Sequence, residues 1–116
     1  MGLVGLSLAG GVLAADRAVS ASLPHVIVTV KDGVFTPADV TVGAGEWTVI
    51  ELVNQDVVVR DWMVQGVANM DIVTRPGQTA SLRFVLDTPG TYPVMTDGSA
   101  AGTGGRLAGS LVVEPR

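Results

Sequence analysis

The chain has 116 residues, 47% of them hydrophobic and 16% charged, which suffices for one packed domain and leaves little for a second. The net charge of −4 and the isoelectric point near 4.6 provide no basic surface for nucleic acid and no polybasic segment for anionic lipid. There is no cysteine, so the chain forms neither a disulfide bond nor a thiolate. Composition therefore excludes nucleic-acid-binding proteins, disulfide-stapled domains and thiol enzymes.

The first 15 residues contain no charged side chain, and Asp16 and Arg17 follow them. A helix of that length would be roughly 22 Å long, shorter than a hydrocarbon core of roughly 30 Å. Small-residue sequences that suit signal-peptide cleavage follow at Ala15 and at Ala21, but no positively charged leader precedes the apolar run. Two interpretations therefore remain open, a membrane anchor and an uncleaved signal-like segment.

The composition of residues 1–15 favours the anchor. Their glycines, alanine and serine would let another helix approach closely, as at helix interfaces inside membranes. We expect this segment to dock on partner chains and, secondarily, on lipid, and residues 16–23 to be a linker. The leucines of the segment are the candidate contacts: Leu3, Leu6, Leu8 and Leu13. The alternative is a glycine-rich leader with no packing role.

From residue 24 onward the apolar residues follow a period of two, which is typical of strands. The predicted strands are 25–31, 39–42, 47–53, 58–65, 70–73, 79–86, 91–95 and 110–114. Turn sequences rich in glycine, proline and Asn/Asp separate them, and no sustained helical period occurs. Residues 24–116 are therefore predicted to form a single all-β, antiparallel Greek-key sandwich, with a glycine-rich loop at 96–106.

The order of several short motifs in this region resembles that of the cupredoxin family. They are Phe35-Thr36-Pro37, Gly43-Ala44-Gly45, Asn54-Gln55-Asp56, Arg75-Pro76-Gly77-Gln78-Thr79, Pro89-Gly90-Thr91-Tyr92 and residues 107–113. Each motif is weak alone, but together they follow the strand and turn order of the family over nearly the whole folded body. The resemblance implies a cupredoxin-like β-sandwich.

Cupredoxins hold a type 1 copper ion with two imidazoles, one thiolate and a weak axial thioether. The resemblance places these four ligands at Arg60, Thr96, Ala101 or Gly102, and Leu107. None of these side chains binds copper in the manner of the family, and the single histidine, His25, matches no ligand position. The resemblance thus implies a copper-free relative, and we expect no cofactor.

Three further sets of residues are candidate sites. Met63, Met70 and Met95 could form a thioether cluster for Cu(I), but their spacing is irregular and methionine is a common core residue. His25 is interpreted as a solvated residue at a strand edge. No Ser–His–Asp arrangement can be assembled, so we expect no catalytic activity.

Two arginines are the candidate partner-binding residues of the sandwich, because arginine makes bidentate contacts with carboxylates at interfaces. If the resemblance holds, Arg60 and Arg106 gather at one end of the sandwich near Asp61 and Asp97. The alternative is a solvated rim of weak ion pairs. Trp62, beside them, is either a core residue or an interface anchor.

These expectations favour a non-catalytic accessory subunit that stabilises a larger membrane complex from its periplasmic or extracellular side. By analogy with the family, that complex would be a respiratory or photosynthetic electron-transfer complex. Its partners would be the protein subunits of the complex and, through residues 1–15, the membrane. The alternative is a free-standing periplasmic binding or metal-handling module that uses the methionines. A degenerate enzyme domain is a third class, which no residue supports.

Overall fold

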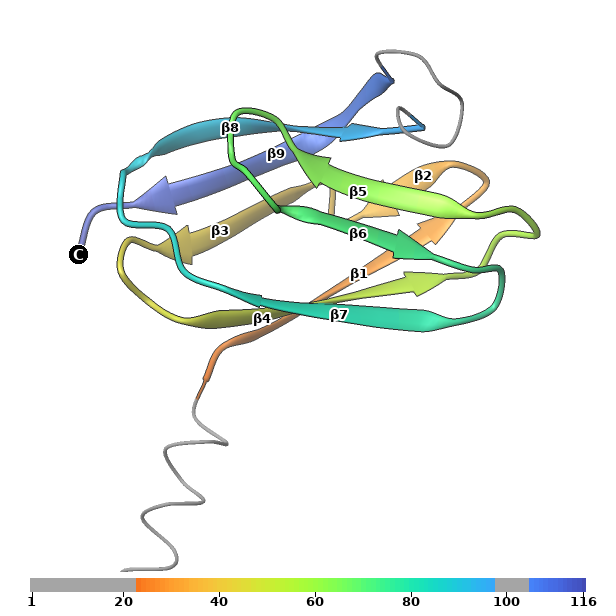
Figure 1. Ribbon diagram of the computed structural model, residues 1–116, viewed down its shortest axis with the longest axis horizontal. Helices are drawn as coiled ribbons and strands as arrows, with labels where there is room; N and C mark the ends of the chain where they lie inside the picture. Colours follow the sequence, from red (N-terminus) through yellow and green to blue (C-terminus); the bar gives the residue numbers. More distant parts are fainter. Residues whose placement is uncertain (1–22, 98–104) are drawn as a thin grey trace, which may run out of the picture.

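The computed structural model describes residues 23–97 and 105–116, which form nine strands in two facing sheets (Figure 1). In the four-stranded sheet the order is β2 (Val34–Thr36), β1 (His25–Lys31), β4 (Thr48–Asn54) and β7 (Thr79–Phe84). In the five-stranded sheet the order is β3 (Asp39–Gly43), β9 (Arg106–Glu114), β8 (Gly90–Thr96), β5 (Arg60–Val64) and β6 (Asp71–Thr74). No helix occurs in the described ranges, and the predicted all-β sandwich is confirmed.

The core lies between the two sheets and is built from alternate residues of the strands. In β4, Ile50 and Leu52 are fully buried, while Glu51 between them is half-buried on the outer face. Each fully buried aliphatic side chain of this kind contributes roughly 1.5–3 kcal/mol. The buried hydrophobic residues are Val28, Val30, Phe35, Val40, Val42, Ile50, Leu52, Trp62, Val64, Met70, Ile72, Phe84, Val94, Leu111 and Val113.

Strand pairing differs in one respect from the antiparallel expectation. β1 pairs with β4 in parallel, and β3 pairs with β9 in parallel, whereas the other pairs are antiparallel. The cause is the crossover through β2 and β3, which separates β1 from β4 along the chain and carries β3 into the other sheet. Such long-range pairing leaves no local sequence pattern.

A glycine permits the close approach of β9 to the chain that enters β3. A Cβ atom at Gly109 would lie 1.8 Å from the carbonyl oxygen of Ala38. The next residue, Ser110, donates its N–H to that same oxygen at 3.0 Å. Any side chain at position 109 would displace the start of β3 from β9.

Several predicted boundaries need correction. β2 was not predicted, because three residues are too few to show a period. β9 begins at Arg106, four residues before the predicted start, because the small residues Ala108 and Gly109 interrupt the alternation of large apolar residues there. The expected loop at 96–106 lies mostly outside the described residues, as do the anchor at 1–15 and nearly all of the linker at 16–23.

The two ends of the sandwich are formed by different segments of the chain. Residue 23 enters at one end, here called the entry end, and β1 then runs to the opposite end (Figure 1). That opposite end is formed by residues 31–34, 55–60, 96–97 and 105–107 and is here called the network end. The seven residues of β1 separate the two ends by roughly 23 Å.

Candidate functional site

Three strands of the five-stranded sheet bring the predicted positions together at the network end. Arg60 is the first residue of β5, Thr96 is the last residue of β8, and Arg106 is the first residue of β9. Thr96 and Arg106 are cross-strand partners, and β5 runs antiparallel to β8 in the register that pairs Met63 with Met95. The prediction that Arg60 and Arg106 gather at one end is confirmed.

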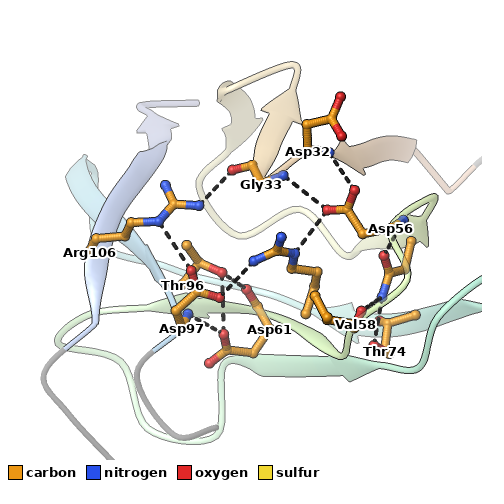
Figure 2. A network of polar contacts seen from close by, with 11 residues as sticks. Asp32, Gly33, Asp56, Val58, Asp61, Thr74, Thr96, Asp97 and Arg106 are labelled. Atoms are coloured by element: carbon orange, nitrogen blue, oxygen red, sulfur yellow. Dashed lines mark hydrogen bonds and ion pairs between the residues drawn. The ribbon is translucent and has the colours of Figure 1, made fainter. Parts of the chain in front are cut away.

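Four charged side chains form a continuous series of ion pairs there, here called the Asp–Arg chain: Asp56, Arg60, Asp97 and Arg106 (Figure 2). Nε of Arg60 lies 2.9 Å from Oδ2 of Asp56, and Nη1 of Arg60 lies 3.2 Å from Oδ1 of Asp97. Nε of Arg106 lies 3.1 Å from Oδ2 of Asp97. Two positive and two negative charges therefore compensate one another.

The Asp–Arg chain also joins the two sheets through the turn after β1. The backbone N–H of Gly33 donates to Oδ2 of Asp56 at 3.0 Å, and the N–H of Asp32 donates to Oδ1 of the same carboxylate. Nη2 of Arg106 donates to the carbonyl oxygen of Gly33 at 2.7 Å. The β1–β2 turn of one sheet is thus held by Arg106 of the other sheet and by Asp56 of the loop between the sheets, as Figure 2 shows.

The pair Asp56 and Arg60 is held in its charged form. The N–H of Gly33 contributes most to lowering the pKa of Asp56; burial opposes this, and the N–H of Asp32 and the guanidinium of Arg60 lower the pKa further. Burial works to lower the pKa of Arg60, but hydrogen bonds to Asp56 and Asp97 outweigh it, so the pKa is raised. Their side chains are only 7% and 18% exposed, so solvent screens this pair little.

A second buried polar group fixes the loop between β4 and β5. Nδ2 of Asn54 donates to the carbonyl oxygens of Val58 at 2.8 Å and Thr74 at 3.0 Å. Oδ1 of Asn54 accepts the N–H of Asp56 at 2.8 Å, and the Asn54 residue is 1% exposed. The loop at 55–59 is therefore held at both of its ends.

The position of the family's thiolate is occupied by a buried hydroxyl. Oγ1 of Thr96, which is fully buried, donates to the carbonyl oxygen of Asp61 at 2.6 Å and lies 3.3 Å from Oδ1 of the same residue. The N–H of Asp97 donates to that Oδ1 at 2.5 Å. The hydroxyl hydrogen of Thr96 is thus already used in a hydrogen bond to the backbone of β5.

The residues present do not fit a type 1 copper ion. Arg60 has a fixed positive charge and no lone pair for a metal, and Leu107 offers only hydrocarbon and is 66% exposed. Positions 101 and 102 lie outside the described residues. Within the described ranges, no group of three or more His, Cys, Asp and Glu side chains is placed to hold a metal ion.

The remaining candidates fall in different places. Trp62 is 1% exposed and packs in the core, so of its two interpretations the core residue is correct, and its indole is not on the surface. Met63 and Met95 are direct cross-strand partners and half-buried, but Met70 is a core residue. His25 is exposed at the entry end. The four leucines of residues 1–15 lie outside the described residues.

Sequence reasoning missed the function of Asp56, which it used only as part of a turn. The partners of this carboxylate, Asp32 and Gly33, are 24 and 23 residues away and meet it only after the crossover between the sheets. The charge pair Asp56 and Arg60, four residues apart, was the one local signal. In a loop, however, that spacing does not by itself predict contact.

The fold and the site together define a class, a cupredoxin-type sandwich with a series of ion pairs across its network end. The sequence profile of the cupredoxin-like domain matches residues 4–112, and the chain belongs to that family. No curated protein sequence matches the chain.

Solved structures share the fold at low sequence identity. Auracyanin A, a "blue" copper protein from Chloroflexus aurantiacus, is 16% identical with a TM-score of 0.62, over 78% of this chain and 98% of its own. Auracyanin from the photosynthetic bacterium Roseiflexus castenholzii is 16% identical with a TM-score of 0.63, over 78% of this chain and 97% of its own. A chain of a heme-copper terminal oxidase dimer is 16% identical with a TM-score of 0.55, over 96% of this chain and 97% of its own.

Proposed function

We propose that this chain is a copper-free, non-catalytic accessory subunit that stabilises a membrane electron-transfer complex from its periplasmic side. The observation that carries the proposal is the Asp–Arg chain, because it occupies the end of the sandwich where the family holds copper. Neither a one-electron carrier nor a hydrolytic site can be built from three ion pairs whose charges compensate one another and from the Thr96 hydroxyl, which already donates its hydrogen bond to Asp61. A structural role remains for a well-packed sandwich.

Attachment to a membrane complex is supported by the apolar sequence of residues 1–15 and by one of the structural likenesses. The likeness to a chain of a heme-copper terminal oxidase dimer covers 96% of this chain, whereas the likenesses to the auracyanins cover 78%. We therefore assign the attachment to residues 1–15. Within residues 23–97 and 105–116, no helix has the length and apolarity needed to span a bilayer.

The position of residue 23 gives an orientation to this subunit. Since residue 23 lies at the entry end, an anchor at residues 1–15 places the entry end toward the membrane and the network end away from it. Partners that reach the network end would then be extramembrane parts of the complex.

Deletion of residues 1–15 tests the proposal. The strands supply their own core, so the deleted chain should remain folded. It should no longer co-purify with the complex that detergent extracts from membranes. The measurement is mass spectrometry of the proteins that co-purify with tagged full-length and deleted chains, with circular dichroism as the control for folding. A deleted chain that co-purifies at full occupancy contradicts the assigned attachment, and a full-length chain that purifies alone contradicts the accessory role.

A second candidate function is a free-standing periplasmic binding or metal-handling module, favoured by one observation. Met63 and Met95 lie side by side across β5 and β8, and thioethers are ligands that suit Cu(I). Competition for Cu(I) against a chromogenic chelator distinguishes the candidates. Binding of one equivalent that is lost in Met63→Leu supports the metal-handling module, whereas no binding supports the accessory subunit.

A further inference from the structure

The exposed large hydrophobic side chains of the described residues are concentrated at the network end. Only Ile27 and Trp47 lie elsewhere. The members at or next to the network end are Val34, Val57, Val58, Val59, Val73 and Leu107. Exposed apolar side chains that gather at one end of a domain mark interaction sites more often than scattered single ones do.

Three of these residues are consecutive and form the valine loop, defined as Val57, Val58 and Val59. They are 90%, 47% and 41% exposed. A mobile polar turn would connect β4 to β5 equally well, so the three valines are not required by the connection.

The backbone of the valine loop is nevertheless held firmly. Asn54 binds the carbonyl oxygen of Val58, and Asp56, just before the loop, accepts three hydrogen bonds from buried or half-buried donors. Valine also has little side-chain freedom to lose on contact, since it is stiff at χ1. The valine loop is therefore pre-organised, and the ordering cost of binding through it is small.

We infer that the valine loop docks on an apolar, uncharged extramembrane surface of the same complex, as a second contact beside the N-terminal segment. This inference rests on the proposed function. The partner surface is apolar because valine side chains offer no hydrogen bond, and it is uncharged because the adjacent Asp–Arg chain compensates its own charges.

The small size of the valine loop favours a surface of the same complex, and not a second copy of the chain, as the docking partner. A stable independent interface buries roughly 800 Å² per partner, and three valines supply well under half of that. A contact this small is effective only when another attachment holds the partner nearby and raises its effective concentration. A lipid surface is excluded by position, because the loop lies at the end opposite the entry of residue 23.

The test compares two substitutions in one loop. Val57→Asp removes the most exposed valine and adds a charge, while Gln55→Asp adds the same charge beside it without removing an apolar side chain. Both positions are exposed, so both full-length variants should unfold at the wild-type temperature. We expect Val57→Asp to dissociate from the detergent-extracted complex roughly tenfold faster than wild type, and Gln55→Asp to behave as wild type.

The contact partner is identified by crosslinking, which the absence of cysteine makes site-specific. Full-length Val57→Cys and, as the control, Ile27→Cys are labelled in membranes with a thiol-reactive photocrosslinker. A crosslink from position 57 to an extramembrane segment of a co-purifying subunit, absent from position 27, supports the inference.

Three results overturn the inference. They are dissociation of Val57→Asp no faster than that of Gln55→Asp, a crosslink from position 57 to a second copy of the chain, and a crosslink to lipid alone. In each case, a wild-type chain that still co-purifies through residues 1–15 leaves the proposed function standing. A wild-type chain that purifies alone overturns the proposed function and this inference with it.

Discussion

Asp56 accepts hydrogen bonds from the N–H groups of Asp32 and Gly33 and from the guanidinium of Arg60. All three donors favour the charged carboxylate over the protonated acid, and its pKa is lowered as a result. The same residue immediately precedes the valine loop and ends the series of ion pairs. One carboxylate therefore connects the turn of one sheet, the loop between the sheets and the first strand residue of β5.

A depressed pKa in the folded state makes the stability that Asp56 provides dependent on pH. This stability is fully present above the pKa of the unfolded chain, near 3.8, and is lost as the pH falls through the lower pKa of the folded protein. We expect the urea concentration at the unfolding midpoint of the wild type to decrease as the pH is lowered below about 4. Asp56→Asn should unfold at lower urea at pH 7 and show a flatter dependence below pH 4.

The matched control for this titration is Asp71→Asn. Asp71 is an exposed carboxylate on β6 and belongs to neither the Asp–Arg chain nor the β1–β2 turn. It should leave both the midpoint at pH 7 and the acid slope close to the wild type. Equal acid slopes in Asp56→Asn and wild type would contradict the stabilising function of Asp56.

Among the secondary-structure elements, the Asp–Arg chain joins β5, β8 and β9 to the β1–β2 turn. Arg60 and Arg106 differ in environment, because their side chains are 18% and 49% exposed. Loss of a partly buried charge that holds two carboxylates removes one charged hydrogen-bond partner from each of them, whereas exposed pairs contribute little. The inner arginine should therefore matter more than the outer one.

We predict that Arg60→Gln lowers the free energy of unfolding by about 1–2 kcal/mol and Arg106→Gln by less than about 1 kcal/mol. The double variant should lose more than the sum, since only this variant leaves Asp97 without an arginine partner. Urea unfolding at low and at high salt measures both effects, and salt should weaken the Arg106 contribution more. Equal losses of unfolding free energy in Arg60→Gln and Arg106→Gln would contradict the expectation that the more buried arginine contributes more.

The sequence predicted most strands because their inward residues alternate, as in Val26, Val28 and Val30 of β1. It did not predict the parallel pairs, because they depend on a crossover of the whole chain. For the site, the gathering of Arg60 and Arg106 followed from the strand order alone. The nearness of Asp97 to these arginines was part of the same prediction. The contacts of Asp56 with the β1–β2 turn were not predicted, since contacts between residues 23 and 24 positions apart are set by packing.

For the whole molecule, the proposed attachment and the proposed docking contact lie at opposite ends of one sandwich. The entry end receives the chain from residues 1–22, and the network end carries the compensated charges and the exposed valines. Among the described residues, the core between them holds no buried ionisable group, because the buried carboxylates Asp56 and Asp61 are at the network end. This separation suits a rigid spacer that is attached at one end and makes contact at the other.

The most direct test of the central claim, that ion pairs have taken the place of copper, is a measurement of copper binding by the purified full-length chain. The chain is produced in copper-supplemented medium, and its metal content, visible spectrum and thermal unfolding midpoint are measured with and without added Cu(II). We expect far less than one copper ion per chain, no intense thiolate-to-copper band, and an unchanged midpoint, because a ligand raises the midpoint only by binding the folded state. One tightly bound copper ion per chain with a raised midpoint would contradict the account.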